Sequence, residues 1–244
     1  IRPEGREPIY RAGGLLREYG TNGRILTLGD SHALMWAPIV DEIAERDGYS
    51  VIISGMTATQ PYFDFVDLSR LEGNDRATLA ERLEIAEARR RVVDVWGPDL
   101  VVISTRELPD QQVLDAFVAY FEERSIPLLF IAQPPVLAFG NTGAHQFLRY
   151  MTKFREIDPL RPVRVRALDE HLEQRELLLG LVARCTSCHL LDTATFFAAG
   201  NDHAVVADGG RIFYYDDDHL SIEGGEMLAP KLEEVIAGIL AGRG

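Results

Sequence analysis

Residues 24–34 have the sequence RILTLGDSHAL, and this stretch decides the fold. Residues 24–28 form a short, mainly apolar run that predicts a buried strand, and a helical pattern runs from about Ala33 to Asp47. Gly29 permits a sharp turn between the two elements. Ser31 then lies at the head of the helix, among backbone N–H groups and at the positive end of the helix dipole. The stretch therefore predicts a strand–turn–helix unit that presents a serine.

Outward from this unit, short apolar runs alternate with helical patterns along the chain. Further strands are predicted at residues 51–54, 100–104, 127–132 and 189–192, and further helices at 74–95, 110–124, 169–184 and 222–240. The strands are continuously apolar, which favours a parallel sheet that helices cover on both faces. We therefore expect an α/β protein: a three-layer α/β/α, doubly wound parallel sheet of flavodoxin-like type. Its sites should lie beyond the carboxyl ends of the strands.

We expect residues 1–23 to be a linker and residues 24–244 to form a single domain, within which residues 133–162 are a variable stretch. The 244 residues carry a net charge of -13, which disfavours binding to nucleic acids or to anionic lipid. No apolar run is long enough to cross a bilayer. Because the first residue is isoleucine and no leader follows it, we expect the chain to be processed or cut from a larger protein.

A second group of reactive side chains lies near the other end of the chain. Residues 214–221 have the sequence YYDDDHLS. His219 can be the base that activates a serine, and Asp216, three residues earlier, can reach its imidazole and fix the tautomer. Asp217 and Asp218 are then solvated or structural. The alternative is a solvated acidic turn whose final serine caps the last helix.

Together the two segments resemble the SGNH (GDSL-like) hydrolase superfamily. The resemblance rests on G-D-S at residues 29–31 and on D-x-x-H-L-S-x-x-G at residues 216–224, and it covers about residues 24–240. The forms GDSHA and YxDDDHLS resemble one branch most, the extracytoplasmic SGNH domain fused to the membrane-embedded acyltransferase family 3 domain, which O-acetylates cell-surface glycans. The resemblance implies the fold and a triad of Ser31, His219 and Asp216.

The sequence departs from the superfamily pattern at the oxyanion hole. Gly55, after the second strand, is the only candidate for the glycine of the second block. Where the third block has an asparagine, this chain has Ser104, Thr105 and Arg106. We expect the backbone N–H groups of Ser31 and Gly55 to bind the oxyanion, with Thr105 or Arg106 replacing the missing side chain. Loss of one such donor costs about 10²–10³ in rate, so we expect slow hydrolysis.

We therefore expect a serine-dependent transfer of an acyl group, in the first place acetyl, to a cell-surface carbohydrate. The location would be periplasmic or otherwise extracytoplasmic, tethered to the inner membrane, and a fused or partner membrane acyltransferase domain could be involved. No metal or other cofactor is needed. One alternative is an esterase of the same fold. A second is a metal-dependent phosphoesterase that uses Asp30 and His32, and a third is a non-catalytic module that binds glycan or carries haem.

Residues 185–189 have the pattern C-x-x-C-H, which is found at c-type haem attachment sites. A local disulfide between Cys185 and Cys188 is favoured in an oxidising compartment, and buried free thiols are the remaining alternative. We expect the two cysteines to be bonded to each other or buried.

Several other side chains receive simpler predictions. Tyr62 and Phe63 could stack on a sugar or pack over the sheet, and the arginines at 89–91 are expected to form a solvated helix end. His145, His171 and His203 are expected at the surface or in loops.

Overall fold

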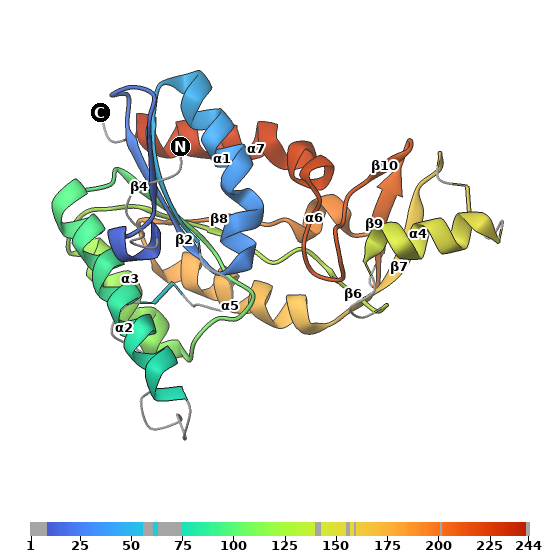
Figure 1. Cartoon of the computed structure of the whole chain (residues 1–244), viewed down its shortest axis with the longest axis horizontal. Coiled ribbons are helices and arrows are strands. Elements are labelled where there is room, and N and C mark those ends of the chain that lie inside the picture. Colours follow the sequence, from blue (N-terminus) through green and yellow to red (C-terminus); the bar gives the residue numbers. More distant parts are fainter. Residues whose placement is uncertain are drawn as a thin grey trace. The chain divides into compact units, whose positions relative to one another are not determined.

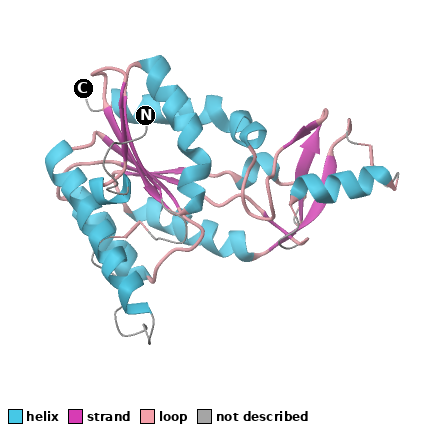
Figure 2. Cartoon of the chain, in the orientation of Figure 1, coloured by secondary structure: helices cyan, strands magenta, loops and turns pink. Residues whose placement is uncertain are grey.

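A computed structural model describes residues 9–55, 61–62, 75–139, 143–154, 157–158, 160–200 and 202–242. The chain divides into two compact units, of which the first runs to Leu129 and the second runs from Phe130 to Arg243. Figures 1 and 2 show the helices and strands of both units. Within the described ranges, no helix is long and apolar enough to span a membrane.

The first unit is built on a mostly parallel sheet. The strands lie in the order β1-β3-β2-β4, and β5 lies next to β4. β2 pairs in parallel with both β3 and β4, whereas β1 pairs antiparallel with β3. The bounds of the strands are β1 Leu15–Glu18, β2 Arg24–Gly29, β3 Ser50–Gly55, β4 Leu100–Ser104 and β5 Leu128–Ile131. The central strands are fully buried beyond their first residue, which is why they consist mainly of apolar residues.

Helices cover both faces of this sheet because of the strand order. The chain leaves β2, returns through α1 (Ser31–Asp47) to β3 on one side, and then crosses back through α2 (Asp75–Arg91) to β4 on the other. Right-handed crossovers in opposite directions place their helices on opposite faces. Figure 1 shows α1 on one side of β2 and β4, with α2 and α3 (Gln111–Glu122) on the other. The predicted α/β fold with helices flanking a mostly parallel sheet is confirmed.

The same strand order makes the carboxyl end of β2 the point where the direction of winding reverses, which is the usual site position in such sheets. Gly29 at this end is in register with Gly55 of β3 and with Ser104 of β4. Gly29 has a φ of 155°, and a Cβ there would lie 1.8 Å from the carbonyl oxygen of Ser104. Only glycine therefore fits between the ends of these two strands.

The second unit contains the rest of β5, with β8 (Cys188–Leu191) beside it, and a separate antiparallel sheet in the order β10-β9-β7-β6. The strands of this sheet are β6 Val136–Leu137, β7 Val163–Leu168, β9 His203–Asp208 and β10 Arg211–Ile212. The helices are α4 Ala144–Lys153, α5 Glu170–Arg184, α6 Ala194–Phe197 and α7 Ile222–Ala241. Cys185 and Cys188 form a disulfide between α5 and β8.

The predicted strands and helices occur near their expected positions, and the differences lie elsewhere. The stretch expected to be variable contains β6 and α4, and the stretch expected to be a linker contains β1. β7 was not predicted because arginines alternate with apolar residues in its sequence, VRVRAL, as suits a strand with one wet face. The long helix predicted to Val95 ends at Arg91 and continues as a π-helical turn, η3 (Val92–Trp96).

Candidate active site

The turn after β2 is organised by the carboxylate of Asp30, the N-cap of α1. One carboxylate oxygen, Oδ1, accepts a hydrogen bond from the backbone N–H of His32 at 2.8 Å. The other, Oδ2, accepts from the hydroxyl of Thr105 at 3.0 Å and from the backbone N–H of Arg106 at 2.9 Å. Asp30 thus ties the start of α1 to the segment after β4. Ser31, the first residue of α1, is half-buried at this helix end.

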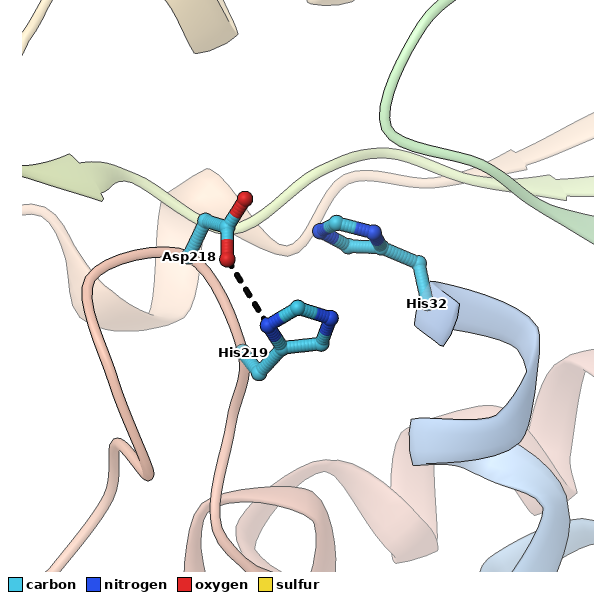
Figure 3. A group of neighbouring side chains, drawn as sticks. All are labelled: His32, Asp218 and His219. Atoms are coloured by element: carbon cyan, nitrogen blue, oxygen red, sulfur yellow. Dashed lines mark ion pairs between the residues drawn. The ribbon is translucent and has the colours of Figure 1, made fainter. Parts of the chain in front are cut away.

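Asp30 is a buried carboxylate that stays ionised. Burial acts to raise its pKa, but hydrogen bonds from the His32 side chain and from the Arg106 and His32 backbones lower the pKa to about 2. His32, which extends from the first turn of α1 (Figure 3), is fully buried, with Nδ1 3.4 Å from Oδ1 of Asp30. These contacts give Asp30 a capping role, and they occupy the carboxylate on which the metal-dependent alternative depends.

Gly55, Thr105 and Arg106, which were predicted to bind an oxyanion, differ in where they lie and in what they contact. Gly55 lies beside Gly29 in the register of β3 and β2. The hydroxyl of Thr105 donates to Asp30 and also lies 3.1 Å from the carbonyl oxygen of Glu107, so its single proton already serves the turn. Arg106 has an exposed side chain, which leaves it as the candidate side-chain donor.

The loop before α7 is held by hydrogen bonds between its own backbone groups and by others that it accepts from the N–H groups of Leu137 and Ala144. The N–H of Tyr215 donates to the carbonyl of His219 at 2.8 Å, and the N–H of Ser221 donates to the carbonyl of Phe213 at 2.9 Å. The Ser221 hydroxyl caps α7 by accepting from the N–H of Gly224 at 3.1 Å. A Cβ at Gly224 would lie 2.0 Å from the Phe213 carbonyl oxygen. This packing explains the serine and the glycine of the H-L-S-x-x-G segment.

Within this loop, Asp216 lies against the imidazole of His219, the contact that the D-x-x-H spacing makes possible. Nδ1 of His219 is 3.0 Å from Oδ1 and 3.1 Å from Oδ2 of Asp216. Oδ1 also accepts from the backbone N–H groups of His219, at 2.7 Å, and of Asp218, at 3.1 Å. Asp216 therefore holds both the ring and the turn that carries it. Ser31 belongs to the first unit, and Asp216 and His219 belong to the second.

A second carboxylate meets the same nitrogen, and sequence reasoning missed its role. Oδ1 of Asp218 lies 2.7 Å from Nδ1 of His219 (Figure 3), and the residue is only 3% exposed. Asp217, between the two acids that contact the ring, is half-buried. The acidic run alone gives no signal that separates Asp218 from Asp217, since the fold of the turn decides which carboxylate faces inward.

The two carboxylates set the charge of the ring. Hydrogen bonds that the His219 ring donates to Asp216 and, next in effect, to Asp218 raise the pKa of His219 to about 10, although burial acts to lower it. The pKa of Asp216 is lowered to about 2 because hydrogen bonds from the His219 side chain and backbone outweigh its burial. The ion pair therefore persists through neutral pH, and it keeps Nδ1 protonated and turned toward the acids.

Two predictions about other side chains are wrong. Arg89 is not part of a solvated helix end but is buried, while Arg91 is exposed. His171 is also buried, with Nδ1 2.7 Å from the carbonyl oxygen of Leu168. Tyr62 is buried edge-to-face against Phe117, in keeping with the packing alternative. Phe63 lies outside the described residues.

The family model for the SGNH domain fused to AT3 domains matches residues 6–234 of this chain. Among curated protein sequences, none matches it. Solved structures that share the fold include the following two. The lipopolysaccharide acetyltransferase periplasmic domain of Salmonella ser. Paratyphi A has a TM-score of 0.62 and 17% identity, over 90% of this chain and 86% of that chain. A proposed acylhydrolase from Bacteroides fragilis has a TM-score of 0.54 and 14% identity, over 97% of each chain.

Proposed function

Because this chain belongs to the family of SGNH domains fused to AT3 domains, we propose that it transfers an acetyl group to a carbohydrate hydroxyl through a Ser31–His219–Asp216 triad. Family membership gives the broader class: the chain is an SGNH-type acyltransferase or esterase. The observation that carries the triad is the contact of Asp216 with Nδ1 of His219 at 3.0 Å. Because Asp216 contacts Nδ1, the other nitrogen, Nε2, is the one that accepts the serine proton once the ring is neutral.

In the proposed reaction, Oγ of Ser31 bonds to the carbonyl carbon of an acyl donor while Nε2 of His219 takes the hydroxyl proton. Asp216 stabilises the resulting imidazolium. The N–H groups of Ser31 and Gly55, with Arg106, stabilise the oxyanion. The bond to the leaving group then breaks, and His219 returns the proton to the departing oxygen. This leaves an acyl-enzyme on Ser31.

In the second half of the reaction, a sugar hydroxyl attacks the acyl-enzyme. His219 removes the proton of that hydroxyl, the bond to Oγ breaks, and the proton passes to Ser31. Water in place of the sugar gives hydrolysis by the same steps. Whether the acyl group is transferred or hydrolysed therefore depends on whether a sugar hydroxyl or water reaches the acyl-enzyme.

The proposed acetyl group, glycan acceptor and periplasmic location draw support from one similar structure, which is described as the periplasmic domain of a lipopolysaccharide acetyltransferase. The disulfide between Cys185 and Cys188 fits an oxidising compartment. The proposed partner is the membrane-embedded AT3 domain, to which domains of this family are fused. That domain would anchor the protein at the inner membrane and supply the acyl group.

The test is hydrolysis of p-nitrophenyl acetate together with covalent labelling by a fluorophosphonate, located by peptide mass spectrometry. We expect slow hydrolysis, a label on Ser31, and loss of both in Ser31→Ala, because no other group can replace the nucleophile. Ser187→Ala, which changes a half-buried serine outside both motif segments, is the control and should behave as wild type. Activity that survives Ser31→Ala but disappears with a chelator would contradict the proposal and favour a metal at Asp30 and His32.

A further inference from the structure

Arg89 is a buried cation in α2 that the proposed chemistry leaves unexplained. Its side chain is only 2% exposed, while Arg91, two residues along the helix, is exposed. Burial lowers the pKa of Arg89 to about 10, and the charge of Asp30 acts in the opposite direction, so the guanidinium remains charged at neutral pH. Taking a cation out of water costs several kcal/mol before any pairing, so acceptors around the guanidinium must offset that cost.

The guanidinium of Arg89 joins the carboxyl ends of two neighbouring strands. Nη2 donates to the carbonyl oxygen of Gly29 at 3.1 Å and to the carbonyl oxygen of Ser54 at 2.8 Å. Nε donates to the hydroxyl of Ser54 at 3.2 Å. Gly29 is the last residue of β2, and Ser54 directly precedes the last residue of β3. All of these atoms belong to the first unit.

Each of these carbonyls belongs to a peptide group that has a place in the proposed site. A peptide group is planar and, here, trans, so fixing its carbonyl oxygen also fixes the N–H on the opposite side. The Ser54 carbonyl is in one plane with the N–H of Gly55, a proposed oxyanion donor. The Gly29 carbonyl is in one plane with the N–H of Asp30, the residue before the proposed nucleophile. One guanidinium thereby sets the orientation of both peptide groups.

We propose that Arg89 is a positioning residue that holds the Gly55 N–H and the turn before Ser31 in the orientation needed for acyl transfer. The inference rests on the proposed function of Ser31. Its consequence is specific: loss of Arg89 should slow the chemical step and leave binding of the acyl compound nearly unchanged. A role confined to fixing α2 on the sheet would lower stability only.

The test measures fluorophosphonate labelling of the full chain as a function of probe concentration, which separates the maximal rate constant from the half-saturating concentration. We expect Arg89→Gln to reduce the maximal rate constant by about 10²-fold, the usual effect of losing one oxyanion donor. The half-saturating concentration should change by less than about twofold, because the contacts to the probe remain. Arg89→Lys keeps the charge but cannot span two carbonyls, so its maximal rate constant should lie between those of Arg89→Gln and the wild type.

Two variants of the same helix serve as controls. Arg91→Gln removes an exposed arginine and should label as wild type does. Ile85→Ala removes a buried side chain one turn before Arg89, so it should lower the melting temperature without slowing the labelling. Wild-type labelling by Arg89→Gln would overturn the proposal. The proposal would also be overturned if Arg89→Gln and Ile85→Ala lose the same amount of melting temperature and their labelling rates fall equally.

Amide hydrogen exchange separates this inference from the proposed function. If the wild type is not labelled at Ser31, the proposed function fails. The positioning role is then judged from peptides that cover residues 24–34 and 50–55, which should exchange faster in Arg89→Gln than in Ile85→Ala. Equal exchange in the two variants would overturn the role of Arg89. If Arg89→Gln does not fold, the same comparisons are made with Arg89→Lys.

Discussion

The turn after β2 holds Ser31 of the proposed triad, and the loop before α7 holds Asp216 and His219, but different kinds of contact build the two segments. The turn is held by residues that are distant in the sequence: Asp30 bonds to Thr105 and Arg106, and Arg89 bonds to Gly29. The His219 ring is held locally, since Asp216 bonds both the ring and the backbone of His219, three residues along the chain, while the loop backbone also accepts hydrogen bonds from the N–H groups of Leu137 and Ala144.

This difference shows which contacts of a site a short sequence motif can predict and which it cannot. In the loop, Asp216 and His219 of the motif contact each other directly, so their spacing predicts that contact. In the turn, Gly29 and Asp30 depend on partners between 60 and 76 positions away. Substitutions far from the turn should therefore disturb it, whereas the orientation of the His219 ring should respond chiefly to changes within the loop.

The largest expected effect is on folding, and it applies to both regions. Gly29→Ala and Gly224→Ala each place a Cβ within about 2 Å of a backbone carbonyl oxygen, which cannot move as a side chain could. We expect both variants to lose more than about 3 kcal/mol of stability or to fail to fold. Soluble yield and thermal unfolding followed by circular dichroism provide the measurement.

Gly238→Ala is the matched control for these glycines. A Cβ at this position in α7 meets nothing within 4 Å, so alanine should stabilise the helix by about 0.5–1 kcal/mol. A wild-type melting temperature for Gly29→Ala would show that the strand ends can separate, and the distant contacts would then not define the turn.

The next effect separates the three acids of the loop. Asp216→Asn should lower turnover of p-nitrophenyl acetate by about 10²–10⁴-fold, because an amide favours the wrong histidine tautomer. Compared at the high-pH plateau of each variant, Asp218→Asn should cost about tenfold, since Asp216 still faces Nδ1 while one charge-assisted contact is lost. Asp217→Asn is the control and should matter little. A reversed order of Asp216 and Asp218 would assign the orienting role to Asp218.

The pH dependence of turnover tests the charge of the loop. His219 must be unprotonated at Nε2 to accept a proton, and its pKa lies above the ordinary value of 6.5. Turnover should therefore rise with pH well above 6.5, and Asp218→Asn should move this rise to lower pH. A wild-type profile with its midpoint at or below 6.5 would contradict the paired arrangement.

The same pKa gives a stability prediction with a defined sign. Because folding raises the pKa of His219, its ion pair stabilises the protein fully below about pH 6.5, and this stabilisation is lost as the pH rises toward about 10. Thermal unfolding between these pH values should show the loss in the wild type. The loss should be smaller in Asp218→Asn.

The smallest effect concerns a contact outside both regions. Replacing Cys185 and Cys188 together by serine should lower stability by no more than about 2 kcal/mol, because their disulfide closes a very short loop. Turnover at room temperature should stay unchanged, and urea unfolding checks the stability. A strong loss of turnover would show that the segment between α5 and β8 supports the site.

The strands and helices of the parallel sheet, and the two motif segments, were determined by the sequence alone. Apolar runs and helical spacing are local properties, so β2, β4 and α7 could be recognised without knowing their neighbours. The gap between Asp216 and His219 is equally local. The antiparallel sheet of the second unit escaped prediction because strands such as β7 carry charged residues on one face.

The tertiary structure alone decided which charges are buried and what they contact. Three arginines in a row gave no sign that Arg89 bonds carbonyls 35 and 60 positions away while Arg91 remains exposed. Three aspartates in a row likewise gave no sign that Asp218 turns inward. Whether a charged side chain is solvated depends on the acceptors and donors that the fold brings around it, and those belong to other segments of the chain.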